Sequence, residues 1–163
     1  IDLISKIGEK ITVRRSDFIP SNKRINFSYV HSESKKNIGK IGVLLSLHTT
    51  KTKSELLELG KQLAMHIAAS SPLAIDKKDL DQSLLKKEKE IITEQLKNSG
   101  KDSKIIDKIA SGKLNKFISE NTLLNQEWIM DSKKKVTDVL KEAANKGKIE
   151  IIKFVRFKVG EGI

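Results

Sequence analysis

The stretch 79–118, DLDQSLLKKEKEIITEQLKNSGKDSKIIDKIASGKLNKFI, determines the architecture that we expect for this chain. Apolar residues recur three, four or seven positions apart on both sides of an Asn-Ser-Gly break at 98–100, and Asp102 or Ser103 can cap the second half. Each half is about 18 residues long, which is marginal for an isolated helix in water. Folded back on each other, the two halves bury both apolar stripes, which predicts an antiparallel helical hairpin close to a two-stranded coiled coil. The residues expected to pack inside it are Leu85, Ile92, Leu96, Ile106, Leu114 and Phe117.

Upstream of the hairpin, three segments alternate apolar and polar residues in the manner of half-buried strands. They are Lys10–Phe18, Arg24–Val30 and Ile38–Leu47. The connections between them are short and polar, as in the loop Ser32–Asn37. Connections of this kind favour an antiparallel meander of the three consecutive strands.

Three helices and one further strand complete the expected elements. Ile1–Ile7 is typical of a helix end, because a glycine follows it. Ser54 can cap a second helix, which the Ser-Ser-Pro run at 70–72 ends. After the hairpin, Val136–Ala144 predicts a third helix, and Ile149–Val159 is the strongest strand pattern of the chain.

These elements predict an α+β fold, with two small antiparallel-sheet and helix subdomains and the helical hairpin inserted as a coiled coil. The first subdomain comprises residues 1–53 and holds the three-stranded meander, incomplete at its start. The second comprises residues 54–80 and 121–163, and the hairpin comprises residues 81–120. The chain begins at Ile1 rather than at a methionine, so we expect further sequence to precede it in the whole protein.

The composition restricts the classes of function. The 163 residues contain no cysteine, which excludes disulfides, thiol catalysis and cysteine-ligated metals. No apolar run approaches the roughly 20 residues that a membrane span needs. The net charge of +11 is compatible with an acidic partner, yet lysine supplies most of it and a solvated surface is the simpler interpretation.

No motif for catalysis or for cofactor binding is present in the sequence. His31, His48 and His66 lie in separate segments and lack the spacing of a zinc helix, so we expect no metal site. There is no phosphate-binding loop, dinucleotide fingerprint or nucleophile elbow. The sequence therefore indicates a protein that binds a partner, is not an enzyme and needs no cofactor. Arg14-Arg15 and Lys133–Lys135 could contact phosphates, but too few aromatics are present for an RNA-stacking platform.

Three stretches in this order carry a resemblance to a known family. They are LAMHIAASSP at 63–72, GKLNKF at 112–117 and FVRFKVGEGI at 154–163. Residues 7–15 and the stretch KIGVL at 40–44 add to it. Together they resemble translation elongation factor Ts over essentially the whole chain. The family's N-terminal helical domain and its Thr-Asp-Phe-Val motif have no counterpart here, since Ser16-Asp17-Phe18 lies on the first expected strand.

The resemblance implies a function. Elongation factor Ts is the guanine nucleotide exchange factor of elongation factor Tu: it opens Tu, disturbs the magnesium and phosphate site and lets GDP leave without any covalent change. The resemblance also implies a protruding hairpin used for homodimerisation or partner contact. We expect a bacterial cytoplasmic location, with the mitochondrial matrix as the other compartment that suits the chain. The alternative function is that of a basic RNA- or ribosome-associated binding protein.

The resemblance further implies three partner-binding positions. Ile41-Gly42 match the family's residues that face the nucleotide-binding domain of Tu. His66 matches the histidine of a Met-His pair near the same domain, although a core-edge histidine is the plainer interpretation. Ile129-Met130 match an apolar pair that meets another domain of Tu. Trp128 stands where the family usually has a phenylalanine.

Overall fold

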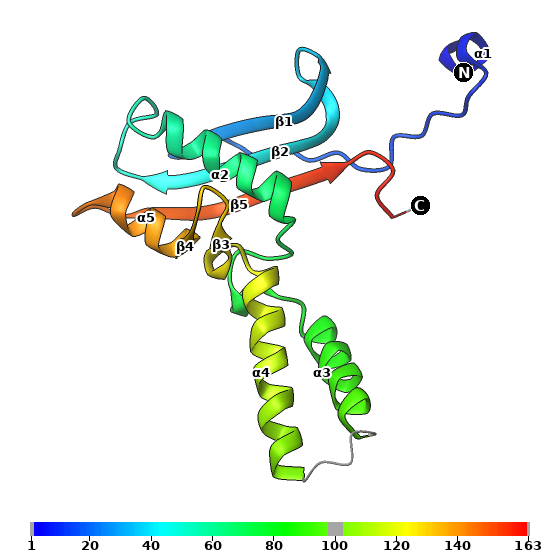
Figure 1. Ribbon diagram of the computed structural model, residues 1–163. Coiled ribbons are helices and arrows are strands. Elements are labelled where there is room, and N and C mark those ends of the chain that lie inside the picture. The colour runs from blue at the N-terminus through cyan, green and yellow to red at the C-terminus, as the bar shows by residue number, and fades with distance from the viewer. Residues whose placement is uncertain (1, 98–102, 163) are drawn as a thin grey trace.

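The computed structural model describes residues 2–97 and 103–162. One three-stranded sheet, two helices packed on it and a projecting helical arm make up most of the molecule (Figure 1). The expected α+β fold class is confirmed, since helices and small antiparallel sheets are combined. None of the helices in the described ranges has the length and apolar character that crossing a membrane requires.

The main sheet comprises β1 (Ile25–Lys35), β2 (Ile38–Thr49) and β5 (Ile149–Lys158). The strands are antiparallel and β2 lies in the middle. Phe27, Leu45 and Phe154 stand side by side across the sheet. Because side chains alternate between the two faces of a strand, this register places every second residue against the helices. The expected polar loop at 32–37 is shorter than predicted, because β1 continues to Lys35.

The predicted meander is wrong in its first strand. Residues 9–21 contain no strand, and the third strand of the sheet is β5, from the other end of the chain. Val13 and Phe18 are exposed rather than packed. In a meander this segment would pair with β1, whose outer edge carries no strand among the described residues. Its arginines instead bind the end of the chain: Arg14 donates to the Glu161 carbonyl and Arg15 pairs with the Glu161 carboxylate. The apolar run of β5 supplies the third strand by pairing along nearly the whole of β2.

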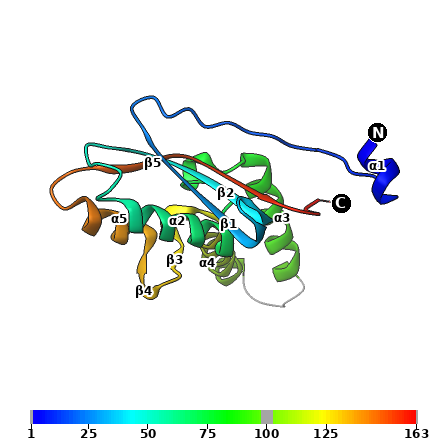
Figure 2. The same ribbon diagram turned by 90° about the horizontal axis from the view of Figure 1, so that it is seen from above.

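Residues 14–19, which we call the strap, cross the face of the sheet opposite the helices (Figure 2). Side chains hold the strap in place. The Arg15 guanidinium lies 4.6 Å from the centre of the Phe157 ring, and Lys153 binds Asp17 at 2.9 Å. The Asn26 amide donates to the Ile19 carbonyl at 3.0 Å. The strap therefore covers part of a sheet face that is otherwise open.

Two helices cover the other face of the sheet, α2 (Leu57–Ser70) and α5 (Val136–Ala144). The bounds of α5 match the prediction, and α2 ends at a left-handed Ser71 as the Ser-Ser-Pro run predicts. The predicted Ser54 cap is wrong, because α2 begins after Leu56 without a side-chain cap. Instead, Thr52 donates to the Glu55 carboxylate in the preceding turn.

One hydrophobic core lies between these helices and the sheet. Its fully buried members come from strands, from α2 and from the segments after the arm: Leu45, Leu47, Leu63, Ala64, Ile67, Leu123 and Val136. The core and the sheet run across the boundary expected between residues 53 and 54. Residues of both expected subdomains thus share one core and one sheet. The division into two subdomains stays a prediction of the sequence pattern.

The arm consists of α3 (Gln82–Lys97) and α4 (Ser103–Asn121), after a short 3-10 helix, η1 (Lys77–Asp79). The two helices lie side by side and project from the sheet (Figure 1). Ile92 and Leu96 are buried between them, while Leu85 and Leu114 pack at the root of the arm against Ala74, Leu80 and Ile118. Ile106 and Phe117 are half-buried. The break at 98–100 and the cap at Asp102 lie outside the described residues.

Three short elements connect the arm to α5: the 3-10 helix η2 (Leu123–Asn125) and the paired strands β3 (Glu127–Trp128) and β4 (Asp131–Lys135). At the other end of the chain lies α1 (Asp2–Ile7). Gly8 follows it with a φ of +73° and donates to the Ile4 carbonyl at 2.8 Å. This confirms the predicted glycine stop.

Candidate functional site

Helix α2 carries His66 into the interior. His66 follows Leu63 by three positions and precedes Ile67, so it shares the helix face that packs on the sheet. Its side chain is fully buried in this chain. The structure therefore places His66 beneath the surface, where it can support a contact surface rather than form one.

Two hydrogen bonds determine which nitrogen of the His66 imidazole carries the proton, and burial keeps the ring neutral. Nε2 lies 2.9 Å from the Gln126 amide oxygen, and the Ile129 backbone N–H donates to Nδ1 over a long 3.4 Å. A proton on Nε2 and a lone pair on Nδ1 satisfy both contacts. Burial lowers the pKa of His66 below its ordinary value of 6.5, and the hydrogen bond to Gln126 opposes this only in part. The neutral imidazole is therefore the stable form.

The Trp128 ring stacks on His66, with 5.2 Å between the ring centres and 20° between the planes. Trp128 is itself buried. It pairs with Asp131 across β3 and β4, so Ile129 and Met130 are the two central residues of the connecting turn. His66 and Trp128 together form the base on which that turn rests.

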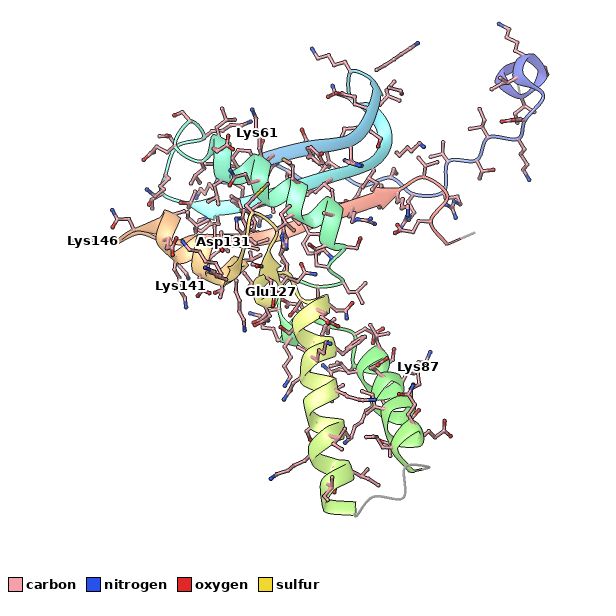
Figure 3. All side chains as sticks on the ribbon, in the orientation of Figure 1. Lys61, Lys87, Glu127, Asp131, Lys141 and Lys146 are labelled. Carbon is pink, nitrogen blue, oxygen red and sulfur yellow. The ribbon has the colours of Figure 1, made fainter. Side chains whose placement is uncertain are left out.

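Ile129 is 42% exposed and Met130 is 48% exposed, although both are apolar. Tight turns usually carry glycine, asparagine, aspartate or proline, because those residues suit the backbone and the solvent. An apolar pair at such a tip, on a rigid base, suits contact with a partner. Figure 3 labels Glu127 and Asp131, which flank the turn beside α5.

Ile41 and Gly42 lie on β2, opposite Lys158 and Phe157 of β5. Ile41 packs on the core, while Gly42 faces the open side of the sheet. A Cβ at residue 42 would meet no atom within 4 Å. Gly42 lines a groove of about 400 Å³ on that open face, whose other apolar lining residues include Val30, Leu44, Val155 and Phe157.

The Ile129-Met130 turn lies on the helix side of the sheet beside α5, whereas Gly42 faces the opposite, open side. Arg156 stands opposite Val43 in the sheet, and its Nε donates to the Ala68 carbonyl at 3.2 Å, close to the end of α2. This contact ties the beginning of β2 to the helix end that carries His66. No hydrogen bond or ring contact among the described residues joins Ile41 or Gly42 to His66 itself.

Sequence reasoning missed Gln126, whose side chain is 6% exposed and contacts His66. The available signal was a pair of neighbouring amides, Asn125 and Gln126, between the apolar pair Leu123-Leu124 and Trp128, in a stretch without clear periodicity. Burial of a polar group requires hydrogen-bond partners, and those partners come from elements far apart in the sequence. The tertiary structure was therefore needed to find it.

The residues that the structure describes contain no group of three or more His, Asp or Glu that could hold a metal ion. His31 contacts the Tyr29 hydroxyl and His48 contacts the Lys23 carbonyl, each far from His66 in the chain. What the geometry provides is an apolar turn on a rigid base and an open groove beside Gly42.

These features define a class of fold: an α+β protein with a projecting helical arm and an exposed apolar turn. The family model described as elongation factor Ts matches residues 1–161. The chain belongs to the elongation factor Ts family.

Curated relatives agree with this family. The chain is 40% identical to an elongation factor Ts of Nitrobacter hamburgensis, over 99% of the chain and 53% of that protein. It is 39% identical to one of Rickettsia bellii, over 100% of the chain and 54% of that protein. It is also 39% identical to one of Gluconobacter oxydans, over 99% of the chain and 52% of that protein. The chain spans about half the length of these relatives.

Proposed function

We propose that this chain is the core of a guanine nucleotide exchange factor, which binds elongation factor Tu and promotes GDP release during translation elongation. Membership of the elongation factor Ts family supports the proposal. The observation that carries it is the exposed apolar pair Ile129-Met130 on a turn held by His66 and Trp128. Such a factor acts by binding alone, as a non-enzyme without a cofactor of its own.

Exchange by binding has a thermodynamic requirement. The factor must bind the nucleotide-free form of Tu more tightly than the nucleotide-bound form, and the two ligands then weaken each other equally. A few well-placed apolar anchors can provide this difference in affinity. In our proposal Ile129-Met130 is one anchor, and the open groove beside Ile41-Gly42 receives a second part of Tu. His66 acts from beneath, by holding Ile129.

The arm is proposed as an accessory contact, for a homodimer or for steadying Tu. Its inner residues Ile92 and Leu96 are buried, whereas Ile91 and Ile105 are exposed on its outside. An apolar residue on the outside of a helix pair can contact a second chain. We place the factor in the bacterial cytoplasm, with the mitochondrial matrix as the other compartment.

The contacts that the basic side chains make within the chain favour a protein partner over RNA. Arg14 donates to the Glu161 carbonyl at 2.8 Å, and Arg15 pairs with the Glu161 carboxylate at 3.1 Å. Lys134 pairs with Glu142 at 2.6 Å. Cations that already have anionic or carbonyl partners are poorer phosphate ligands, because binding would first break those contacts. The two basic clusters that could contact phosphates are thus partly used within the chain.

Stopped-flow release of a fluorescent GDP from elongation factor Tu tests the proposal. The full-length protein should speed release, and Ile129→Ser with Met130→Ser should slow that assisted release about tenfold or more, as for interface anchors. Leu57→Ser is the matched control, since Leu57 is 45% exposed and lies at the opposite end of α2. Release at the unassisted rate with the wild-type protein would refute the exchange function. Salt-sensitive RNA binding without Tu binding would support the alternative.

A further inference from the structure

Gln126 is a buried polar side chain for which the fold alone gives no reason. It lies between η2 and β3, and only 6% of it is exposed. An apolar residue of similar size would fill the same space without a need for hydrogen bonds. A buried amide that is kept in a core requires partners for every polar atom, and Gln126 has them.

The Gln126 side chain joins three elements. Its Nε2 donates to the Ser70 carbonyl at 3.2 Å, at the end of α2, and to the Glu120 carbonyl at 2.7 Å, near the end of α4. Its Oε1 faces His66 Nε2 at 2.9 Å. The last carbonyls of a helix lack partners within the helix, so the amide satisfies two such groups at once.

These contacts fix the orientation of the Gln126 amide. The amide in turn fixes which nitrogen of His66 carries the proton. The Ser70 and Glu120 carbonyls can only accept, so the NH2 group of Gln126 must face them. Its oxygen must then face His66, which has to present a proton on Nε2. The lone pair is left on Nδ1, where the Ile129 N–H donates. An amide flip would break this whole chain of contacts.

We propose that Gln126 is a positioning residue for the Ile129-Met130 turn, a role in partner binding that rests on the proposed function. Its amide selects the Nε2–H form of His66 and so provides the acceptor that holds the Ile129 backbone. Because the same amide binds Glu120 of α4, the root of the arm and the contact turn share one hydrogen-bonded junction. A movement of α4 relative to the core displaces the Gln126 amide and thereby shifts the Ile129-Met130 turn.

Nuclear magnetic resonance on the chain without Tu tests the positioning role. In the wild type at pH 7.5, the 15N shifts of His66 should show a protonated Nε2 and an unprotonated Nδ1. Gln126→Met keeps the volume but removes the amide, so the preference for one tautomer should be lost. The exchange of the Ile129 amide with solvent should then speed up about fivefold, the effect of one hydrogen bond.

Asn125→Ala is the matched control. Asn125 is the neighbouring amide, and it binds the Asp76 carboxylate and the Thr122 hydroxyl instead of His66. Its loss should lower stability without changing the His66 tautomer or the Ile129 exchange rate. An equal effect of both variants on His66 and Ile129 would overturn the proposal, because it would show a general loss of packing.

Two further outcomes separate this role from the exchange function. A wild-type His66 that carries its proton on Nδ1 overturns the positioning role, even if Gln126→Met does not fold. With the tautomer as expected, Gln126→Met should weaken Tu binding about as much as it speeds Ile129 exchange. If the wild-type protein does not bind Tu, the exchange function fails while the tautomer and the Ile129 amide still report on Gln126.

Discussion

Phe27 of β1 lies so close to Gly60 of α2 that a Cβ on residue 60 would come within 2.5 Å of three atoms of the Phe27 ring. The ring is buried in the core between the sheet and the helix. Gly60 thus lets α2 approach the sheet more closely than any other residue would allow. This approach sets the position of the helix that carries His66.

Gly60→Ala should therefore destabilise the protein. Alanine favours a helix over glycine by about 1 kcal/mol. Overpacking of a core costs about 1–3 kcal/mol and outweighs this gain, because the Phe27 ring is buried among other core side chains. The midpoint of urea unfolding should fall, and Phe27→Leu should recover part of the loss in the double variant. Unchanged or higher stability would show that α2 can shift away from the sheet without cost.

Gly42→Ala is the same substitution as Gly60→Ala, but at a position with free space around it. A Cβ on residue 42 meets nothing within 4 Å, so the free energy of unfolding should change by less than about 0.5 kcal/mol. The methyl group enters the open groove, so binding to elongation factor Tu should weaken if this groove receives Tu. Isothermal titration gives the affinity and urea unfolding gives the stability. A loss of stability without a loss of affinity would remove Gly42 from the proposed surface.

The stability of the protein should depend on pH through His66. Burial lowers the folded-state pKa of His66 below 6.5. Below that pH the unfolded chain binds a proton that the folded chain does not, so the free energy of unfolding rises with pH in this range. Stability should be full above pH 6.5 and should fall as the pH drops from 6.5 towards the lowered pKa.

Urea unfolding at pH 7.5, 6.5 and 5.5 measures this dependence, with His66→Asn as the reference that lacks the titrating group. The exposed Glu127 and Asp131 flank the turn in both proteins, so the comparison isolates the change at residue 66. An identical pH slope in the wild type and in His66→Asn would contradict the expectation.

Two substitutions of His66 should separate its two hydrogen bonds. Asparagine places a polar atom where Nδ1 lies and can accept from the Ile129 N–H, whereas glutamine reaches the position of Nε2 and can donate to Gln126. Both lose the stacking on Trp128, which makes them a matched pair. His66→Asn should retain more Tu affinity than His66→Gln, by about fivefold for one hydrogen bond. Equal affinities at equal stability would argue against the support of Ile129 by Nδ1.

The arm offers a test with neighbouring isoleucines. Ile92 is 4% exposed between the helices and Ile91 is 48% exposed on the outside. Ile92→Ala should destabilise the arm by about 2–5 kcal/mol through the cavity that it leaves. Ile91→Ala should leave folding intact and should weaken only an association through the outer face. Circular dichroism measures the helices and sedimentation equilibrium measures the association. A monomer that sediments identically for all three proteins would exclude a homodimer through this face.

Local patterns predicted much of the secondary structure. The helix at 136–144 was predicted to the residue, and the strand at 149–159 is one residue shorter in the structure. Both arm helices are present, and their packing residues Ile92 and Leu96 are buried. Amphipathic periodicity is a local property, so it can be read without knowledge of the partner element.

Strand pairing was not predicted in the same way. Residues 10–18 have a strand pattern but no partner strand among the described residues, whereas β5 pairs with β2 from more than a hundred positions away. Alternation shows that a segment can form a strand, but it does not show which edge that segment finds. The third strand of the sheet comes from a segment that is distant in the sequence, so local alternation could not assign it.

The sequence by itself determined the elements, the helical arm, the lack of a catalytic motif and the family resemblance, because each depends on local spacing or on residue identity. Only the tertiary structure decided that His66 is buried beneath an apolar turn, and that Gln126 links this turn to α2 and α4. The reason is physical: burial and hydrogen-bond partners arise when distant segments pack together. The expected contact residues could be named from the family resemblance, but the way in which the fold holds them required the packed chain.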